Sequence, residues 1–154
     1  MAFTTRVIPA PDDLVWAMIS DPSTYPEWLV GAEEIRDIDD DWPAQGTSFH
    51  HRVGLGWLSI ADRTEVVAVD PPRMLSLAVK ARPFVSAVST FRLYPCDDDG
   101  GGTTVVTLEE EPAVRTLGNL VRPVMDPSIH VRNHRSLRRL EGYIFARLAE
   151  VVRP

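Results

Sequence analysis

The residues of this chain best suited to acid–base chemistry are His51, Glu110 and His130, which we take as candidate catalytic residues. Each stands among apolar residues at a regular spacing, so each is expected to face the protein interior. A carboxylate in apolar surroundings holds a proton near neutral pH unless a cation or hydrogen-bond donors offset its charge. The three residues therefore form a candidate site for proton transfer, provided that the fold brings them together.

The orientation of these side chains follows from the alternation of apolar residues along predicted strands, where successive side chains take opposite faces. Phe49 and His51 share the apolar face of one strand, and Glu110 falls on the apolar face of the last strand. Asp62 falls in the favoured inward set of its strand unless a bulge reverses the alternation. The inward side chains that we take as candidate ligand-binding residues on the strands are Phe49, Asp62, Leu75, Leu77, Ser89, Phe91 and Leu93.

A sustained helical pattern runs from 128 to 152, with apolar residues at steps of three and four. At 100° per residue, this apolar stripe extends upstream through Asn133 and His130, with His134 at its margin. In the upstream half of the helix, polar side chains are therefore predicted to face the sheet. In the downstream half, the side chains that face the sheet are predicted to be apolar core residues. Asn133, His134 and Leu137 complete the set of candidate ligand-binding residues.

Two simpler interpretations of these polar residues stay open. In the first, His51, His130 and Asn133 hydrogen-bond each other, backbone groups or trapped water. In the second, Glu110 lies at the end of its strand and meets solvent. The arginines of the same helix fall on the opposite arc and are expected to form a solvated face; they are Arg132, Arg135, Arg138 and Arg139.

Other chemistries have weaker support. His130 and His134 are four residues apart and can share a cation on one helical face, but a firm third ligand is missing, so no metal site is predicted. The glycines at 54–56 and 100–102 stand in expected hairpin turns rather than at a strand-to-helix junction, so neither a phosphate-binding loop nor a cofactor is expected. Cys96 lies at a strand end without an evident base, so a nucleophile is not expected.

Composition excludes several classes of protein. The 154 residues, 44% hydrophobic and 25% charged, suit one globular domain over 1–154. Sixteen lysines and arginines against 22 aspartates and glutamates give a net charge of −6, the wrong sign for a surface that binds nucleic acid. The longest apolar stretch, Leu14 to Ile19, is too short for a membrane span. Because a secretory signal is missing and one cysteine cannot form an internal disulfide, a cytoplasmic location is expected.

The order of the predicted elements defines an α+β fold. A short strand is followed by two short helices, six strands joined by tight turns, and one long helix. Connections this short exclude parallel crossovers, so the seven strands are expected to form one antiparallel sheet. The predicted strands are 3–8, 32–38, 47–53, 57–69, 74–81, 84–94 and 103–111, and the predicted helices are 11–19, 24–30 and 128–152.

Four segments carry a resemblance to a known superfamily: the strand and turn 49–54, the run 64–75 with its Asp70-Pro71-Pro72-Arg73 turn, the stretch 102–105, and the tail 126–140. Over essentially its full length the sequence resembles the START-like (SRPBCC) superfamily. More narrowly, it resembles small actinobacterial proteins labelled polyketide cyclase/dehydrase. The resemblance implies a helix-grip fold, in which a curved sheet wraps around the last helix and leaves a cavity between them.

Three functions fit this scaffold. The first is the binding or carriage of a hydrophobic small molecule, lipid- or polyketide-like, in the cavity. The second is a polyketide cyclase or dehydratase in the same cavity, since a ring-closing aldol reaction needs a base beside a ketone and a donor for the enolate. The three candidate catalytic residues with Asn133 would supply those parts. The third is a protein-interaction module whose cavity is plugged by Trp16, Trp28 and Trp57. The sequence leaves a homodimer open.

Overall fold

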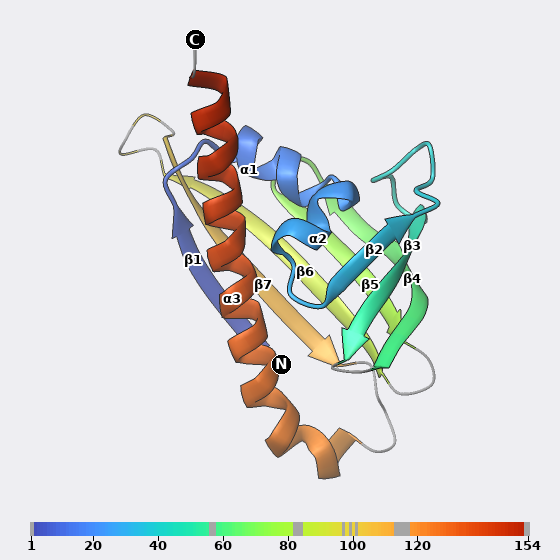
Figure 1. Cartoon of the computed structure of the whole chain (residues 1–154). Helices are drawn as coiled ribbons and strands as arrows, with labels where there is room; N and C mark the ends of the chain where they lie inside the picture. The colour runs from blue at the N-terminus through green and yellow to red at the C-terminus, as the bar shows by residue number, and fades with distance from the viewer. Residues whose placement is uncertain are drawn as a thin grey trace.

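The computed structural model describes residues 2–55, 58–81, 85–96, 98, 100, 102–112 and 118–152, with the backbone alone at 53–55, 58–60, 62, 81, 85–86, 112 and 118–127. Its elements follow the predicted order (Figure 1). They are β1 (Ala2–Ile8), α1 (Asp12–Ile19), the short 3₁₀ helix η1 (Pro22–Thr24), α2 (Tyr25–Trp28), β2 (Ala32–Arg36), β3 (Ser48–Leu55), β4 (Leu58–Asp70), β5 (Met74–Ala81), β6 (Val85–Cys96), β7 (Thr103–Pro112) and α3 (Gly118–Val152).

In the described part of the chain, seven strands form one sheet in the order β1-β7-β6-β5-β4-β3-β2, which makes β1 and β2 the edge strands. All neighbouring pairs are antiparallel. Figure 1 shows α3 lying across one face of this curved sheet, with α1 and α2 beside the C-terminal half of α3. The predicted α+β helix-grip architecture is confirmed, and each predicted strand end lies within two residues of the observed end.

The long helix begins earlier than the sequence predicts. We expected a helix from residue 128, because Pro123 and Pro127 each lack a backbone N–H and crowd the preceding turn. Instead α3 begins at Gly118 and runs through both prolines. Figure 1 shows the first turns of α3 bending away from the axis of the rest, which is how a helix accommodates internal prolines.

One irregularity interrupts the sheet inside β4. Val66 pairs with Leu77 and Val69 pairs with Leu75, so two residues of β4 stand where β5 has one. This β-bulge reverses the alternation only downstream of Val66. Thr64 and Val66, which alternation places on the same face as Asp62, therefore point inward, and both are buried. The side chain of Asp62 itself lies outside the described residues.

Two aromatic side chains from α2 fill the space beneath the C-terminal half of α3. Tyr25 and Trp28 are 1% and 0% exposed, and their rings meet edge to face at 5.2 Å. Each polar atom has a local partner, because the Tyr25 hydroxyl donates to the Ile19 carbonyl at 2.6 Å and Trp28 Nε1 donates to Thr24 Oγ1 at 2.9 Å. Gly31 follows in the left-handed conformation, with φ of 97°, which glycine adopts without steric cost.

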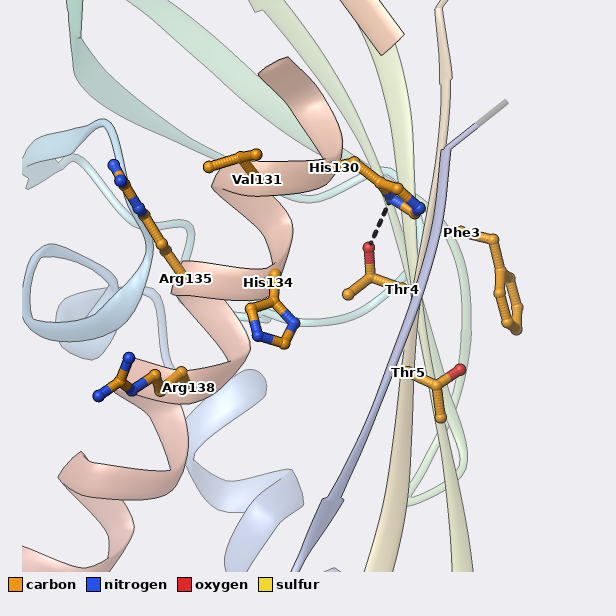
Figure 2. A pocket seen from close by; sticks show the side chains of 8 residues that line it. All are labelled: Phe3, Thr4, Thr5, His130, Val131, His134, Arg135 and Arg138. Atoms are coloured by element: carbon orange, nitrogen blue, oxygen red, sulfur yellow. Dashed lines mark hydrogen bonds between the residues drawn. The ribbon is translucent and has the colours of Figure 1, made fainter. Parts of the chain in front are cut away.

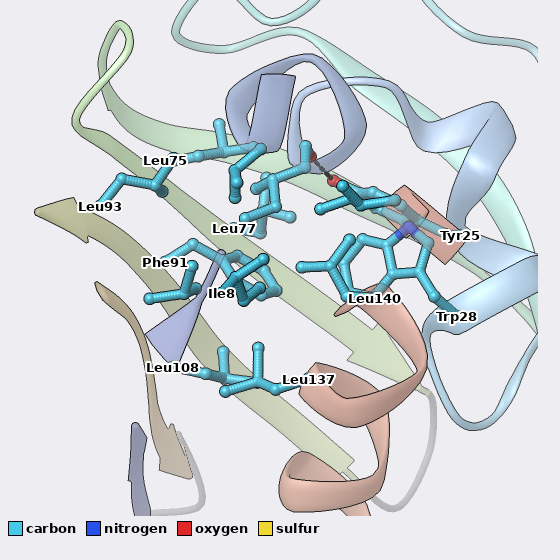
Figure 3. Close-up of a cluster of buried hydrophobic side chains, with 14 of the residues drawn as sticks. Ile8, Tyr25, Trp28, Leu75, Leu77, Phe91, Leu93, Leu108, Leu137 and Leu140 are labelled. Atoms are coloured by element: carbon cyan, nitrogen blue, oxygen red, sulfur yellow. Dashed lines mark hydrogen bonds between the residues drawn. The ribbon is translucent and has the colours of Figure 1, made fainter. Parts of the chain in front are cut away.

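The hydrophobic core joins this aromatic pair to the sheet and to α3 (Figure 3). Trp28 packs edge to face against Phe91 of β6 at 6.0 Å. Of the three tryptophans predicted to plug the interior, Trp28 is fully buried, Trp16 packs half-buried against the core, and Trp57 lies outside the described residues. The predicted apolar stripe of α3 is confirmed by its fully buried members Leu137, Leu140 and Ile144.

None of the described helices combines the length and the apolar character that a bilayer span requires.

Candidate functional site

Two polar side chains of adjacent strands meet on the inner face of the sheet. Ser89 of β6 is the register partner of Glu110 of β7, and both are buried. Ser89 Oγ donates to Glu110 Oε1 at 2.9 Å. From α3, Asn133 Nδ2 donates to Glu110 Oε2 at 3.1 Å, and the Arg132 guanidinium donates to the same oxygen. We call Ser89, Glu110, Arg132 and Asn133 the inner polar cluster.

The sequence predicts part of this cluster. Strand alternation places Glu110 inward, and the structure confirms it, so the interpretation that Glu110 simply meets solvent is wrong. Helical periodicity places Asn133 against the sheet, and Asn133 is 1% exposed. Arg132 was expected on a solvated face; it is exposed, but its long side chain also reaches back to Glu110. A buried carboxylate requires a cation or several hydrogen-bond donors nearby. This requirement of Glu110 is the signal in the sequence that points to Arg132.

The hydrogen bonds of Glu110 constrain what it can do chemically. Both carboxylate oxygens already accept from protein groups, one from Ser89 and one from Asn133 and Arg132. Abstraction of a substrate proton by Glu110 would therefore require one of these bonds to break. In this arrangement Glu110 joins α3 to β6 and β7, and the guanidinium of Arg132 keeps further N–H groups for another acceptor.

The second predicted catalytic residue, His51, lies on a different part of the inner face. It is 5% exposed, as its predicted inward orientation requires, and its Nδ1 lies 3.4 Å from Thr64 Oγ1 of β4. Its register partner is Asp62, whose side chain lies outside the described residues. Three strands, β4, β5 and β6, separate the strand of His51 from that of Glu110. The structure therefore places these two residues in separate regions of one interior surface.

The remaining predicted residues of α3, His130 and His134, lie toward the edge strand β1. Both are exposed. His130 Nδ1 lies 3.3 Å from Thr4 Oγ1, so this side chain does face the sheet, but the expectation that it is buried is wrong. The reason is that His130 stands at the rim of the buried stripe centred on Asn133 and Leu137, where α3 meets the sheet edge.

The protein's own side chains cover the inner face unevenly. Toward α1 and α2 the face is packed, whereas farther along β5 and β6 two inward side chains keep partial exposure. Val79 and Ala87 are register partners that alternation turns toward α3, yet each is only half-buried. We call Val79 and Ala87 the uncovered pair. The predicted ligand-binding residues that belong to the packed core, each at most 3% exposed, are Phe49, Leu75, Leu77, Phe91, Leu93 and Leu137.

The uncovered pair adjoins the inner polar cluster. Ala87 is two residues from Ser89 on the same face of β6. Thr64, the partner of His51, is in turn the register partner of Val79. Apolar surface with partial exposure and buried polar groups therefore lie together on the inner face beneath the upstream half of α3. This combination is typical of a small-molecule site, where a few polar groups orient a mainly apolar ligand.

Comparison with known proteins identifies the family. Residues 3–144 match the family described as polyketide cyclase / dehydrase and lipid transport. The chain belongs to this family. As a member of the polyketide cyclase/dehydrase and lipid transport family, it combines the helix grip with the polar interior described above. No curated protein matches the chain.

Solved structures share the fold at low sequence identity. A protein of Thermus thermophilus aligns with a TM-score of 0.69 at 19% identity, over 94% of this chain and 97% of its own. A conserved protein of Geobacillus kaustophilus has a TM-score of 0.71 at 17% identity, over 94% of each chain. The aromatase/cyclase Zhui from a Streptomyces species has a TM-score of 0.68 at 19% identity, over 96% of this chain and 94% of its own. At these identities the likeness concerns the fold.

Within the residues that the structure describes, His, Cys, Asp and Glu side chains do not gather in threes as metal ligands.

Proposed function

We propose that the protein binds a hydrophobic small molecule, lipid- or polyketide-like, between the sheet and the upstream half of α3. The observation that carries the proposal is the uncovered pair, because Val79 and Ala87 point inward and yet are only half-buried. Membership of a family described by polyketide cyclase, dehydrase and lipid transport supports it. An apolar ligand body that covers this pair would gain roughly 25 cal/mol for each Å² removed from water.

The inner polar cluster gives the ligand an orientation. Arg132 uses part of its guanidinium on Glu110 and is 42% exposed in its side chain. Its remaining N–H groups suit a ketone, hydroxyl or carboxylate at one end of an apolar molecule. Glu110 and Asn133 act in this proposal as positioning residues, since they hold the guanidinium at the border of the interior.

A titration with the fluorescent fatty acid cis-parinaric acid, followed by displacement with palmitate and with the aromatic polyketide emodin, tests the proposal. Val79→Trp fills the proposed site, whereas Val67→Trp makes the same change at an exposed position of β4. We expect Val79→Trp to weaken the binding of cis-parinaric acid at least about tenfold and Val67→Trp to leave it within about twofold, since tenfold is about 1.4 kcal/mol. Equal affinity in both variants would contradict an interior site.

A second candidate function is cyclisation or dehydration of a polyketide in the same space. The family description supports it, as does the burial of His51 on the inner face beside Thr64. In this function His51 takes the proton from the carbon beside a ketone. Turnover of an aromatic polyketone precursor by His51→Ala and Glu110→Gln tests it, and unchanged turnover in both variants would exclude base catalysis by these residues.

A third candidate, the protein-interaction module, has one observation in its favour. Tyr25 and Trp28 fill the interior next to α1 and α2 with the protein's own side chains. Failure of the whole ligand panel to bind, with the fold intact, would favour this function over the other two.

A further inference from the structure

A groove of about 530 Å³ lies outside the proposed interior site, where α3 passes the edge strand β1 (Figure 2). In Figure 2, His130 and His134 lie on the side of α3 that faces β1, whereas Arg135, next to His134, and Arg138, one turn later, extend from the other side of the helix. Its volume falls within the range of small-molecule sites. The lining residues are Phe3, Thr4, Thr5, His130, Val131, His134, Arg135 and Arg138.

The charge of the groove differs from that of the whole chain. The chain carries a formal net charge of −6 with histidine counted as neutral, whereas the described residues of the lining include two arginines, two histidines and no acidic residue. Arg135 and Arg138 therefore place positive charge in one concave region of a protein whose net charge is negative. Such a region attracts small anions and raises their local concentration.

The two arginines of the groove also lack an ion-pair partner among the residues that the structure describes. Among the described residues, Arg135, Arg138 and His134 take part in no ion pair or hydrogen bond between side chains, whereas Arg132 pairs with Glu110 and Arg147 with Glu150. His130 uses one ring nitrogen toward Thr4. Unpaired guanidinium groups offer two parallel N–H donors, a geometry that matches carboxylate and phosphate oxygens.

The nearest carboxylate along α3 does not neutralise these groups. Glu141 lies one turn after Arg138, but its Oε2 accepts from Arg6 Nε at 2.6 Å and from a second nitrogen of the same guanidinium. Arg6 and Glu141 thus satisfy each other and connect β1 to α3. Val131, 52% exposed, stands one turn before Arg135 and gives the same helix face an apolar position next to the cations.

We propose that this groove binds a small amphiphilic anion, with a phosphate or carboxylate group held by Arg135, Arg138 and the N–H of His134, and an alkyl or aryl part against Val131. The site is distinct from the interior and does not depend on what the interior binds. Oxyanions of this kind occur both as free small molecules and as lipid headgroups, and the recognition chemistry is the same for both.

The test is a titration of the isotope-labelled protein with octyl phosphate, in which the NMR chemical shifts of the backbone amides are measured at each ligand concentration. We expect the amides of 130–138 to shift, and the double variant Arg135→Gln/Arg138→Gln to weaken binding at least about tenfold, because it removes the charge-assisted hydrogen bonds of both guanidinium groups. The matched control Arg139→Gln/Arg147→Gln removes the same charge from exposed positions of α3 outside the groove and is expected to stay within about twofold.

Three further arms make the result specific. Octanol, which lacks the anion, is expected to leave the groove amides unshifted. Val79→Trp, which fills the interior, is expected to leave the octyl phosphate shifts at 130–138 intact. Sedimentation of the protein with phosphatidylglycerol vesicles tells a lipid headgroup from a free anion. Vesicle binding that Arg135→Gln/Arg138→Gln abolishes assigns the anion to a lipid headgroup. No vesicle binding by the wild-type protein assigns it to a free small molecule. Equal weakening by the groove and control variants, or shifts confined to the interior, would overturn the proposal.

Discussion

Asn133 of α3 donates to Glu110 of β7 at 3.1 Å, across the boundary between the helix and the sheet. Both side chains are buried, and Ser89 and Arg132 complete the hydrogen bonds of the carboxylate. The contact joins the polar half of α3 to the centre of the grip. It therefore holds the helix at a fixed position beside the uncovered pair, Val79 and Ala87.

Loss of the Asn133 amide is expected to destabilise the fold. Asn133→Ala removes one of the two donors to Glu110 Oε2, and a hydrogen bond to a charged group contributes about 1.5–3 kcal/mol. Urea denaturation measures the change in the free energy of unfolding. His134→Ala, at the adjacent exposed position, serves as the control and is expected to change stability by less than about 0.5 kcal/mol. Equal effects of the two substitutions would mean that the amide contributes nothing to the fold.

The buried phenol of Tyr25 makes stability sensitive to alkaline pH. Burial, with a smaller contribution from the negative charge of Asp21, raises the pKa of the Tyr25 hydroxyl above its usual 10.0. Because the folded-state pKa is the higher one, the stabilising contribution of the neutral phenol is fully present below about pH 10 and is lost as pH rises further. The free energy of unfolding should therefore fall above about pH 10.

Tyr25→Phe checks this assignment. The variant is expected to lose about 1 kcal/mol at neutral pH, because the Ile19 carbonyl loses its donor, and to show a shallower decline in alkali. Tyr94→Phe, at a position 50% exposed on the outer face, should change neutral stability by less than about 0.5 kcal/mol and keep the steep alkaline decline. A parallel decline in wild type and Tyr25→Phe would show that Tyr25 does not titrate on unfolding.

Trp28 is expected to be the most costly aromatic side chain to truncate. Trp28→Ala should lower the free energy of unfolding by about 3–5 kcal/mol, because it removes a fully buried ring that contacts both Tyr25 and Phe91. Trp28→Phe keeps part of the packing and remains measurable if the alanine variant does not fold. Trp16→Ala, at a half-buried position, is the control. Thermal denaturation that ranks Trp16 above Trp28 would contradict the packed core described here.

The Arg6–Glu141 pair should couple β1 to α3. Both side chains are about three-quarters buried, at 25% and 20% exposure, and the pair has two hydrogen bonds. A double-mutant cycle with Arg6→Met and Glu141→Gln is expected to give a coupling energy of about 1 kcal/mol, near the upper end for partly exposed pairs. Additive effects would show that the two side chains do not stabilise each other.

Sequence periodicity predicts the fold and part of the site, because burial imposes a strict pattern on strands and helices. Alternation places Glu110 and His51 inward, and the helical stripe places Asn133 against the sheet; all three are buried as predicted. The same pattern cannot predict Arg132, because a long side chain reaches a partner on a face other than its own.

Two other differences have local causes. The sequence predicts a later start for α3 than the structure shows, because proline rules describe the average helix and not one that bends to accommodate Pro123 and Pro127. The bulge after Val66 leaves no sequence signal that distinguishes it from regular alternation.

Intermolecular nuclear Overhauser effects between unlabelled palmitate and the ¹³C-labelled protein test most directly whether the interior binds a hydrophobic ligand. The account predicts cross-peaks from the alkyl chain to the methyl groups of Val79, Ala87 and Leu137, with those to Ala87 and Leu137 lost in Val79→Trp and kept in Val67→Trp. At saturation with palmitate, cross-peaks only to exposed methyl groups such as the two of Val131, or no cross-peaks at all, would contradict the account.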